Sequence, residues 1–400
     1  MGNMGIWYDY PQCIHLEPTR ACNARCPQCM RTFFNTPETM PNLKITEIDP
    51  LWLDEKFKTD SLFKKVDNIL INGNLGDIVM HSNPKALIQT LLDNGVKVIR
   101  INTNGGALSQ DFWAWLGSQN KVFTAPYDFP MIIVNFAIDG LEDTHHLYRR
   151  NTRYDVVIRN LKTFIQAGGI ANAQINVNGN NKHQMDELYA RLKEMGVNQN
   201  IVRYNQRFVS DFIRIYDKNY REEYKLYSAE KLGTEQIENN PKSWFKQKKK
   251  EFQKEFEIKD FYKSEKVLRL KKKWAKEDTR KYNIQCYVNG DIKLENSPTS
   301  FYLSADGRVW TCCWMENDYN GYVLSNSYSS LIDTYYYEIS KDPFFNSLHH
   351  HTGEEIISLD CFVKLRERWR SNKCLYPCVS ACGSAENISR RESEIVKLKE

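Results

Sequence analysis

Three cysteines, Cys22, Cys26 and Cys29, lie close together near the start of the chain. Three thiolates on one short loop can hold three irons of a cubane 4Fe-4S cluster and leave the fourth iron without a protein ligand. A structural zinc ion, in contrast, normally takes four protein ligands. The spacing therefore predicts a metal centre at which a small molecule binds an open iron. A zinc loop completed by Cys13 or His15 is the alternative.

The chain has eleven cysteines, which is too few for a disulfide scaffold in 400 residues, yet most of them are clustered. Clustering of this kind in a reducing compartment indicates metal binding. The remaining cysteines are Cys13, Cys286, Cys312, Cys313, Cys361, Cys374, Cys378 and Cys382.

Composition places the chain among folded globular proteins, with 41% hydrophobic and 26% charged residues. The length is enough for two or three domains of ordinary size. No run approaches the ~18 apolar residues that a membrane span needs. The amino terminus has no basic region followed by an apolar segment. We expect a cytoplasmic protein that does not cross a membrane.

Six β-rich runs alternate with helical patterns in the first half of the chain. The runs are 13–17, 68–71, 96–101, 131–138, 173–177 and 201–204. The segments between them carry apolar residues at helical spacing, and two end in a glycine at the expected helix stop. Repeated strand and helix predicts a parallel sheet. Periodicity alone leaves an open doubly wound sheet and a partial barrel as the two options.

Polar, glycine-rich segments follow most of these runs. They span 72–77, 102–106, 139–140 and 178–180. Ligands of parallel α/β proteins gather at the carboxyl ends of the strands. The sequence therefore predicts one rim of amides and carboxylates, suited to a polar ligand.

The CxxxCxxC spacing and its position after the first strand resemble the radical S-adenosylmethionine (SAM) enzymes. The resemblance implies an α/β fold with a partial (β/α)6 TIM-like barrel. It also implies that SAM chelates the open iron of a 4Fe-4S cluster held by Cys22, Cys26 and Cys29. In that family an electron from the cluster cleaves SAM, and the 5′-deoxyadenosyl radical takes hydrogen from substrate.

The same resemblance assigns SAM contacts by position. Gly73, Asn74, Gly76 and Asp77 stand where the family has a Gly-Gly-Glu stretch that meets the SAM amino group, with Asp77 or Asn74 as the acceptor. Thr103, Asn104 and Asp139 stand on strand ends that approach the methionine carboxylate or the ribose. Gln28 replaces an aromatic residue that the family often places beside the adenine.

The late cysteines resemble the SPASM and twitch extensions, which hold auxiliary 4Fe-4S clusters. The turn Ala305-Asp306-Gly307-Arg308 predicts a hairpin that delivers Cys312 at its end. We expect one auxiliary cluster with ligands Cys286, Cys312, Cys378 and Cys382, and with Cys374 and Cys361 as substitutes. Cys313 is a candidate hydrogen-atom donor, with a buried inert thiol as the alternative. His349, His350 and His351 are expected on the surface.

The basic character of the chain is concentrated in one segment. Residues 242–281 hold sixteen Lys or Arg against seven Asp or Glu, although the net charge of the whole chain is only +5. Phenylalanines and Trp244 at near-helical spacing predict one or two amphipathic helices there. The segment either exposes a solvated helix face or docks an acidic peptide or nucleic acid.

The predicted organisation has four parts. They are a radical SAM core over 1–210, a basic helical insertion or linker over 211–282, a twitch- or SPASM-like cluster domain over 283–385 and a charged tail over 386–400. The expected function is a radical SAM oxidoreductase that modifies a peptide or protein and is reduced by a donor such as flavodoxin or ferredoxin. A radical SAM dehydrogenase or epimerase of a small molecule is the first alternative. A non-enzymatic, metal-containing nucleic-acid-binding protein is the second.

Overall fold

The computed structural model describes residues 11–120, 130–205, 210–230, 242–253, 300–311, 315–316, 341–363 and 394–397, the last four as a strand without side-chain detail. No helix among these residues is long and apolar enough to cross a membrane.

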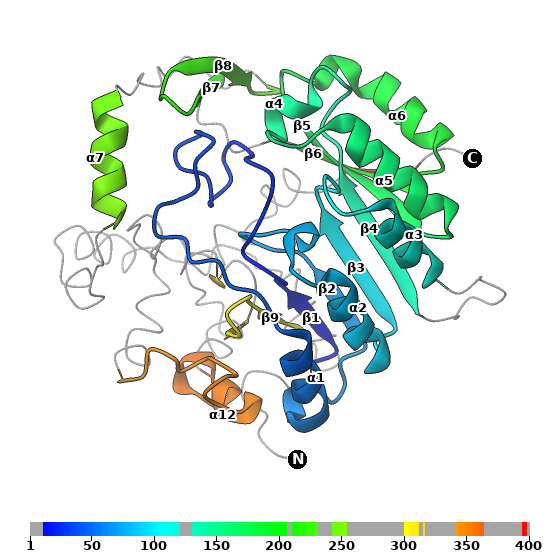
Figure 1. Ribbon diagram of the computed structural model, residues 1–400, viewed down its shortest axis with the longest axis vertical. Helices are drawn as coiled ribbons and strands as arrows, with labels where there is room; N and C mark the ends of the chain where they lie inside the picture. Colours follow the sequence, from blue (N-terminus) through cyan, green and yellow to red (C-terminus); the bar gives the residue numbers. More distant parts are fainter. Residues whose placement is uncertain are drawn as a thin grey trace, which may run out of the picture.

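Six parallel strands form the centre of the main sheet and lie side by side in chain order (Figure 1). They are β1 (Cys13–Leu16), β2 (Asn68–Ile71), β3 (Val98–Thr103), β4 (Met131–Ala137), β5 (Ile170–Val177) and β6 (Gln199–Tyr204). This order confirms the predicted (β/α)6 arrangement. Three strands, β3, β5 and β6, begin two or three residues away from the expected positions.

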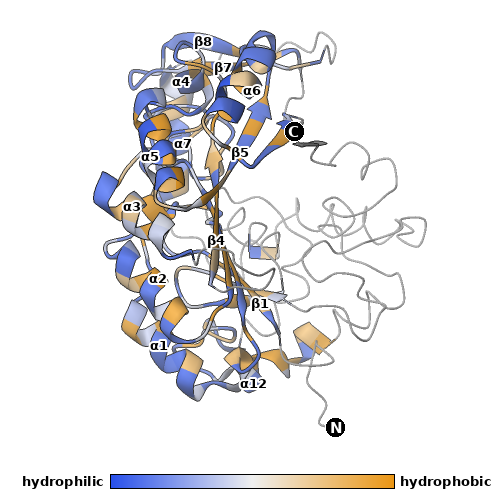
Figure 2. Ribbon diagram, turned by 90° about the vertical axis from the view of Figure 1, so that its right-hand side faces the viewer, coloured by the Kyte–Doolittle hydropathy of each residue, from blue (hydrophilic) through white to orange (hydrophobic). Residues whose placement is uncertain are grey.

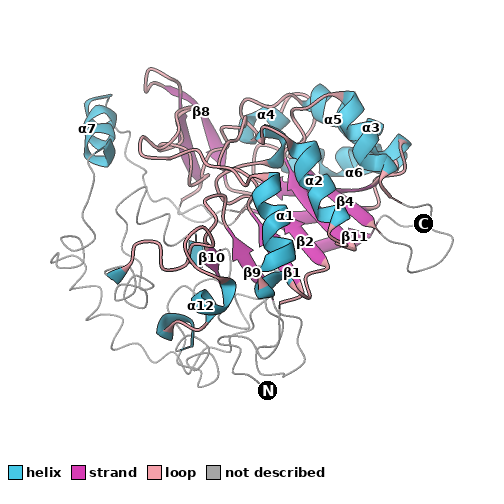
Figure 3. Ribbon diagram, turned by 60° about the horizontal axis from the view of Figure 1, so that its bottom comes forward, coloured by secondary structure: helices cyan, strands magenta, loops and turns pink. Residues whose placement is uncertain are grey.

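Three further strands extend this sheet at its two ends (Figure 3). Strand β9 (Ser300–Leu303) pairs in parallel with the outer side of β1, and β10 (Val309–Trp310) returns antiparallel to β9. Gly307 adopts a φ of 75° in the turn between them, so the predicted hairpin is confirmed. Strand β11 (Glu394–Lys397) pairs antiparallel with β6.

The helices that connect the parallel strands lie on one side of the sheet (Figure 2). They are α1 (Pro50–Thr59), α2 (Pro84–Asp93), α3 (Gln110–Ser118), α5 (Tyr154–Gln166) and α6 (Met185–Glu194), with the short α4 (His145–Tyr148) before α5. Polar side chains accept from free N–H groups in the first turns of α1, α2 and α3, as where the Asn83 side-chain oxygen accepts from the Ala86 N–H at 3.1 Å. Gly95, Gly168 and Gly196 end α2, α5 and α6 with positive φ.

The two faces of the sheet differ in chemistry. Alternate strand residues such as Ile71, Ile101, Val134 and Ile175 are fully buried beneath the helices. Parallel strands covered on both faces are normally apolar throughout. Here, the opposite face carries Asn102, Asn135 and Asn172 in register on β3, β4 and β5.

These asparagines form a row of hydrogen bonds across the strands. The Asn135 amide donates to Asn102 at 2.6 Å, Asn172 donates to Asn135 at 2.9 Å, and Asn198 donates to Asn172 at 3.2 Å. Each amide inside the row uses one N–H and one oxygen lone pair and retains a second of each. We call Asn102, Asn135, Asn172 and Asn198 the amide row.

A further hairpin and a further helix lie beside the loops at the carboxyl end of the sheet (Figure 1). Strands β7 (Phe212–Tyr216) and β8 (Glu222–Tyr227) form a separate antiparallel hairpin. Helix α7 (Lys242–Gln253) stands beside the long loop that follows β1 (Figure 1). The prediction of a helix in the basic segment is thus confirmed over these residues, while 254–281 lie outside the described part. The short 3-10 helices η1 (Ser61–Phe63), η2 (Ile78–Met80) and η3 (Lys182–Gln184) and helix α12 (Gly353–Ile357) complete the fold.

Candidate functional site

The loop that carries Cys22, Cys26 and Cys29 leaves the carboxyl end of β1, and all three cysteines are half-buried residues. One backbone contact to a distant residue and one side-chain contact within the loop hold it in place. The Arg25 N–H donates to the Arg150 carbonyl at 2.8 Å, and the Thr32 hydroxyl donates to the Cys26 carbonyl at 3.0 Å. We call residues 20–32 the cysteine loop.

The loop after β2 packs directly on the backbone of this segment, and Gly76 makes the approach possible. A Cβ at Gly76 would lie 1.7 Å from the Thr19 carbonyl oxygen and 2.9 Å from that of Ala21. The Asp77 N–H donates to the same Ala21 carbonyl at 2.9 Å. Gly73 is equally tight, because its Cβ would lie 2.4 Å from the Gly76 carbonyl oxygen. Gly76 therefore allows close packing between the two loops, and Gly73 allows a tight turn within the loop after β2.

Two thiols of the cysteine loop have polar donors beside them. The Asn104 amide lies 3.8 Å from Cys22 Sγ, and the Arg149 guanidinium lies 3.9 Å from Cys26 Sγ. Burial raises the pKa of Cys22 to about 12 and that of Cys26 to about 11, and Arg149 opposes the second shift. Without a metal both groups are therefore protonated at neutral pH, and binding of a metal would release the protons.

The donor set fits a 4Fe-4S group. Among the described residues, no three His, Cys, Asp or Glu side chains converge on a point suited to a single metal ion. A cubane cluster does not require such convergence, because each cysteine binds a different iron. Cys13 starts β1 and so stands at its far end from the loop, and His15 Nε2 lies 2.9 Å from the Asn72 carbonyl oxygen. The structure thus brings neither proposed fourth zinc ligand to the loop.

Asp77 connects the loops after β2 and β3. One of its carboxylate oxygens accepts from the Thr103 hydroxyl at 2.7 Å and the Val79 N–H at 3.2 Å. The other accepts from the Asn104 N–H at 2.7 Å and its side-chain amide at 2.8 Å. Burial raises the pKa of Asp77, and these donors oppose the rise. The carboxylate therefore orients Asn104 toward Cys22, and its four hydrogen bonds already occupy both oxygens.

Asp139 and Arg149 form a buried ion pair at the end of β4. Arg149 Nε donates to the Asp139 carboxylate at 2.6 Å, and the Asn176 N–H donates to its other oxygen at 2.6 Å. The Asp139 side chain is fully buried. Burial raises its pKa, and Arg149 lowers it. Asp139 thus places the guanidinium near Cys26.

His145 supports this corner as a neutral side chain. The Asp139 N–H donates to its Nδ1 at 3.3 Å, so its Nε2 carries the proton and donates to the Thr152 hydroxyl at 3.1 Å. Burial lowers the pKa of His145 to about 3.

Gln28 lies in the cysteine loop with a φ of 63°, in the left-handed region. Its N–H donates to the Asn35 side-chain oxygen at 3.0 Å, and its own side-chain oxygen accepts from Asn205 at 2.8 Å. The Asn205 residue follows β6, so this contact links the first and last parallel strands of the predicted barrel.

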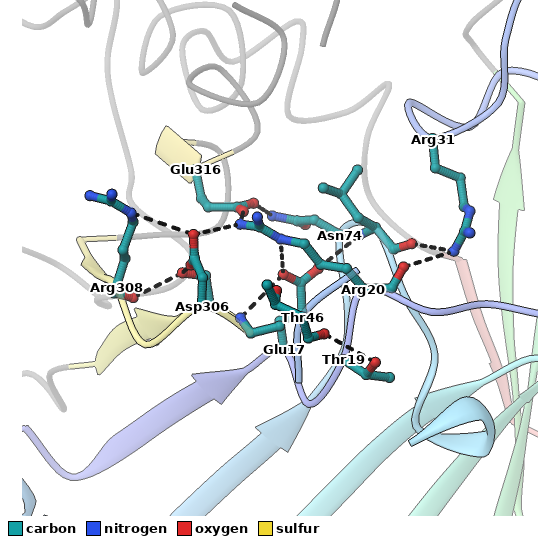
Figure 4. Close-up of polar contacts among 12 residues, drawn as sticks. Glu17, Thr19, Arg20, Arg31, Thr46, Asn74, Asp306, Arg308 and Glu316 are labelled. Atoms are coloured by element: carbon teal, nitrogen blue, oxygen red, sulfur yellow. Dashed lines mark hydrogen bonds and ion pairs between the residues drawn. The ribbon is translucent and has the colours of Figure 1, made fainter. Parts of the chain in front are cut away.

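A buried polar network connects the cysteine loop, the β2 loop and the β9–β10 hairpin (Figure 4). Glu17, at the end of β1, accepts from the Leu75 N–H at 2.8 Å and lies 3.4 Å from Arg20 Nε. Arg20 also lies 3.3 Å from Asp306 and 3.1 Å from Glu316. Both Glu17 and Glu316 are fully buried.

Glu316 links this network to a predicted SAM-contact residue. The Asn74 amide donates to one Glu316 oxygen at 2.7 Å, while Arg20 binds the other. Burial raises the pKa of Glu17, with Arg20 and the Leu75 N–H opposing. The loop after β2 is therefore held between carboxylates from two distant parts of the chain.

Several predicted residues lie outside the described part of the chain, namely Cys286, Cys312, Cys313, Cys374, Cys378 and Cys382. Cys361, one of the two substitute ligands for the auxiliary cluster, is buried in the main hydrophobic core with an exposed fraction of 2%. His349 and His350 are exposed, as predicted, and His351 is half-buried with its Nε2 2.6 Å from Asp342.

The structure adds residues that pattern reading had not assigned. Glu17 and Arg20 stand in the sequence directly before Cys22, so their position was a usable signal. Arg149 and Glu316 had none, because their contacts cross 123 and 242 sequence positions. Arg31 was also missed; its guanidinium donates to the Arg20 and Leu75 carbonyls at 3.1 and 2.7 Å.

No family model matches the chain, and no curated protein sequence matches it. Solved structures with a similar fold include those of SuiB and anSMEcpe. SuiB of Streptococcus suis bound to the precursor peptide SuiA has 11% identity and a TM-score of 0.47 over 89% of this chain and 66% of that one. Native anSMEcpe with bound AdoMet has 16% identity and a TM-score of 0.47 over 97% and 93%.

A second anSMEcpe structure, with AdoMet and the Cp18Cys peptide, has 14% identity and a TM-score of 0.46 over the same shares of the two chains. The match to SuiB covers slightly less than two thirds of the length of that protein. AdoMet is SAM, the cofactor that the sequence resemblance implies here. At these identities and TM-scores, the likeness by itself assigns no activity to the chain.

Proposed function

We propose that this chain is a radical SAM oxidoreductase that takes hydrogen from a carbon of a peptide or protein substrate. One observation carries the proposal: the three-cysteine loop leaves the first strand of a parallel (β/α)6 sheet and packs against the loops after β2 and β3. Asn104 Nδ2 lies 3.8 Å from Cys22 Sγ in this arrangement. The site therefore joins a metal-binding loop to the strand ends where parallel α/β proteins bind ligands.

Cys22, Cys26 and Cys29 would hold the 4Fe-4S group, which supplies an open iron and one electron for reductive cleavage of SAM. The chain's own part is to bind and position. Gly76 lets the β2 loop approach the cysteine loop, Gly73 lets the β2 loop fold tightly on itself, and Asp77 orients Asn104. Asn74, Thr103, Asp139 and Gln28 complete the proposed SAM surroundings.

Asp77 takes a positioning role in this proposal rather than direct contact with the SAM amino group. Its oxygens already accept four hydrogen bonds from Thr103, Val79 and Asn104. Asn74 is then the first candidate for the amino contact, with its own position set by Glu316.

The auxiliary site remains part of the proposal. We assign Cys286, Cys312, Cys378 and Cys382 as ligands of one further 4Fe-4S cluster, with Cys374 as a substitute, and Cys313 as a hydrogen-atom donor to the substrate radical. The burial of Cys361 in the apolar core makes it the weaker substitute. We propose the same domain bounds as before, with a core over 1–210, an insertion over 211–282 and a cluster domain over 283–385. The proposed enzyme is cytoplasmic.

The amide row supports a peptide as substrate over a small apolar molecule. Its side chains on the face opposite the helices retain free N–H and oxygen positions beyond those used between Asn102, Asn135 and Asn172. Alternating donors and acceptors complement peptide groups. A small polar substrate, dehydrogenated or epimerised, is the second candidate, since the same groups also match hydroxyls.

The decisive experiment is anaerobic incubation of the reconstituted protein with SAM and dithionite, followed by mass spectrometry. We expect 5′-deoxyadenosine from the wild-type protein and none from Cys22→Ala. A nucleic-acid-binding protein would instead produce none in either case, retain oligonucleotide binding after Cys22→Ala, and lose that binding steeply as salt is raised.

A further inference from the structure

Helix α7 is anchored beside the cysteine loop by aromatic side chains. Phe245 is fully buried and Phe252 is 7% exposed. Their rings lie 6.4 and 6.1 Å from that of Phe33, which follows Cys29 by four positions. Phe34 adds a contact to Trp244 at 4.8 Å. The helix is therefore fixed against the segment that directly continues the cysteine loop (Figure 1).

An ion pair reinforces the attachment. Lys249 Nζ lies 2.7 Å from the Glu38 carboxylate, which also accepts from the Tyr220 hydroxyl at 3.2 Å. Lys248 is paired as well, with Glu251 at 2.6 Å. Two of the five lysines of α7 are thus neutralised by neighbours.

The other three lysines form one exposed row. Lys242, Lys246 and Lys250 follow at four-residue intervals, which places them along one side of the helix. All three are exposed, and none forms an ion pair within the described part of the chain. Like charges at this spacing destabilise a helix by about 0.2 to 0.5 kcal/mol per pair. An acidic partner would turn this repulsion into attraction.

We propose that Lys242, Lys246 and Lys250 form the docking surface for a small acidic electron-carrier protein of the flavodoxin type. The inference rests on the proposed function, which needs an electron at the cysteine loop. In the exchange the reduced carrier loses one electron, and that electron is consumed when SAM is cleaved to methionine and the 5′-deoxyadenosyl radical. Positive charge at the docking site steers an acidic carrier to the place where its electron is used.

The position and chemistry of α7 favour a protein over a nucleic acid. Surfaces for single-stranded nucleic acid combine basic residues with free aromatic rings for base stacking. On α7 the rings of Phe245 and Phe252 are buried against Phe33, and Trp244 packs on both Phe34 and Phe245. The exposed side thus offers charge without a stacking platform.

The test compares two reductants on the anaerobically reconstituted holoprotein. The variant K242E/K246E/K250E reverses the lysine row, and K85E/R159E/K162E makes the same charge change at exposed positions of α2 and α5. Formation of 5′-deoxyadenosine is measured with photoreduced flavodoxin and with dithionite. Binding of oxidised flavodoxin is measured separately by calorimetry without SAM.

We expect the flavodoxin-supported rate of K242E/K246E/K250E to fall about tenfold or more at low salt, while its dithionite-supported rate stays unchanged. Flavodoxin affinity should fall in parallel, and K242Q/K246Q/K250Q should give intermediate losses. The control variant should match wild type. The wild-type rate with flavodoxin should also decline as salt is raised.

Other results would overturn the assignment. Equal loss with both reductants would make the lysine row structural, and unchanged flavodoxin binding would place the docking surface elsewhere. Loss of binding to a single-stranded oligonucleotide, with flavodoxin binding intact, would make α7 a nucleic-acid surface. Absence of 5′-deoxyadenosine from wild type with dithionite would refute the proposed function, while calorimetry would still decide the docking question.

Discussion

Glu316 accepts a hydrogen bond of 2.7 Å from the Asn74 side chain, although 242 positions separate the two residues. Glu316 is fully buried and lies four positions after Cys312, in the part of the chain assigned to the auxiliary cluster. Asn74 lies in the loop after β2, where we propose that SAM binds. The position of a proposed cofactor contact thus depends on a segment from the other end of the chain.

Replacing Glu316 with alanine should therefore weaken SAM binding. The change leaves the Asn74 amide and one Arg20 nitrogen without this acceptor. Loss of one partner in a buried charged pair lowers the stability of the folded protein by about 3 kcal/mol. We expect SAM affinity to fall about tenfold, corresponding to one buried hydrogen bond, while Glu316→Gln keeps part of it. Calorimetry on the holoprotein measures the effect. Glu55→Ala, at an exposed position of α1, is the control; wild-type affinity in Glu316→Ala would show that Asn74 is held independently.

Gly76→Ala should reduce iron incorporation. The added Cβ would meet the Thr19 carbonyl oxygen at 1.7 Å, so the β2 loop and the cysteine loop must separate. Overpacking of this kind costs about 1 to 3 kcal/mol. Iron per chain after anaerobic reconstitution measures the result. Gly95→Ala tests backbone strain alone, because its φ is 80° but no atom lies within 4 Å of the new Cβ. Equal iron in the two variants would contradict the packing role.

Arg149→Gln should destabilise the protein by about 3 to 5 kcal/mol, because it leaves the fully buried Asp139 carboxylate without its counter-charge. The double variant Asp139→Asn/Arg149→Gln removes both charges and should recover most of this loss. Urea unfolding of the metal-free proteins under reducing conditions provides the comparison. If the double variant is no more stable than Arg149→Gln, the ion pair does not govern stability at this corner.

Acidification should destabilise the sheet because two buried histidines resist protonation. Burial lowers the pKa of His145 to about 3 and that of His15 to about 4. Both lie below the unfolded value of ~6.5, so the unfolded chain binds more protons and stability rises with pH between these limits. Each histidine should therefore lower the free energy of unfolding by about 2 kcal/mol at pH 5 relative to pH 8.

The thermal midpoint of the metal-free protein, followed by far-UV circular dichroism at pH 5 and pH 8, checks this expectation. His145→Gln keeps hydrogen-bonding capacity but cannot be protonated in this range, so its midpoint should depend less on pH. An unchanged pH dependence in that variant would assign the effect to other groups.

Iron content tests the number of clusters. Two cubanes would give about eight irons per chain after anaerobic reconstitution, and changing Cys22, Cys26 and Cys29 together to alanine should leave about half. Four irons in the wild-type protein, all lost in the triple variant, would remove the auxiliary site.

Most of the central sheet was predictable because its residues act locally. Periodic apolar residues in α2, α5 and α6 mark one buried face, and glycines with positive φ end these helices. The six parallel strands were predicted in order. The exact starts of β3, β5 and β6 were not predicted, because polar residues such as Asn172 belong to strand β5 through contacts with the neighbouring strand that the sequence does not display.

The site was only partly predictable for the same reason. Cysteine spacing indicated the metal loop, and the polar strand exits indicated Asn104 and Asp139. The sequence could not show that both carboxylate oxygens of Asp77 accept hydrogen bonds from Thr103, Val79 and Asn104. Nor could it show that β9 would pair with β1, because register between segments so far apart is set by tertiary packing.

The amide row has a consequence for how the strand ends are aligned. Sliding β4 by two residues against β3 would keep its apolar side chains beneath the helices, so hydrophobic burial alone does not forbid the slip. It would, however, separate Asn135 from both Asn102 and Asn172. The side-chain amides thus select one alignment among those that the apolar face tolerates, and they keep the residues after β3 and β4 at a common height beside the thiols.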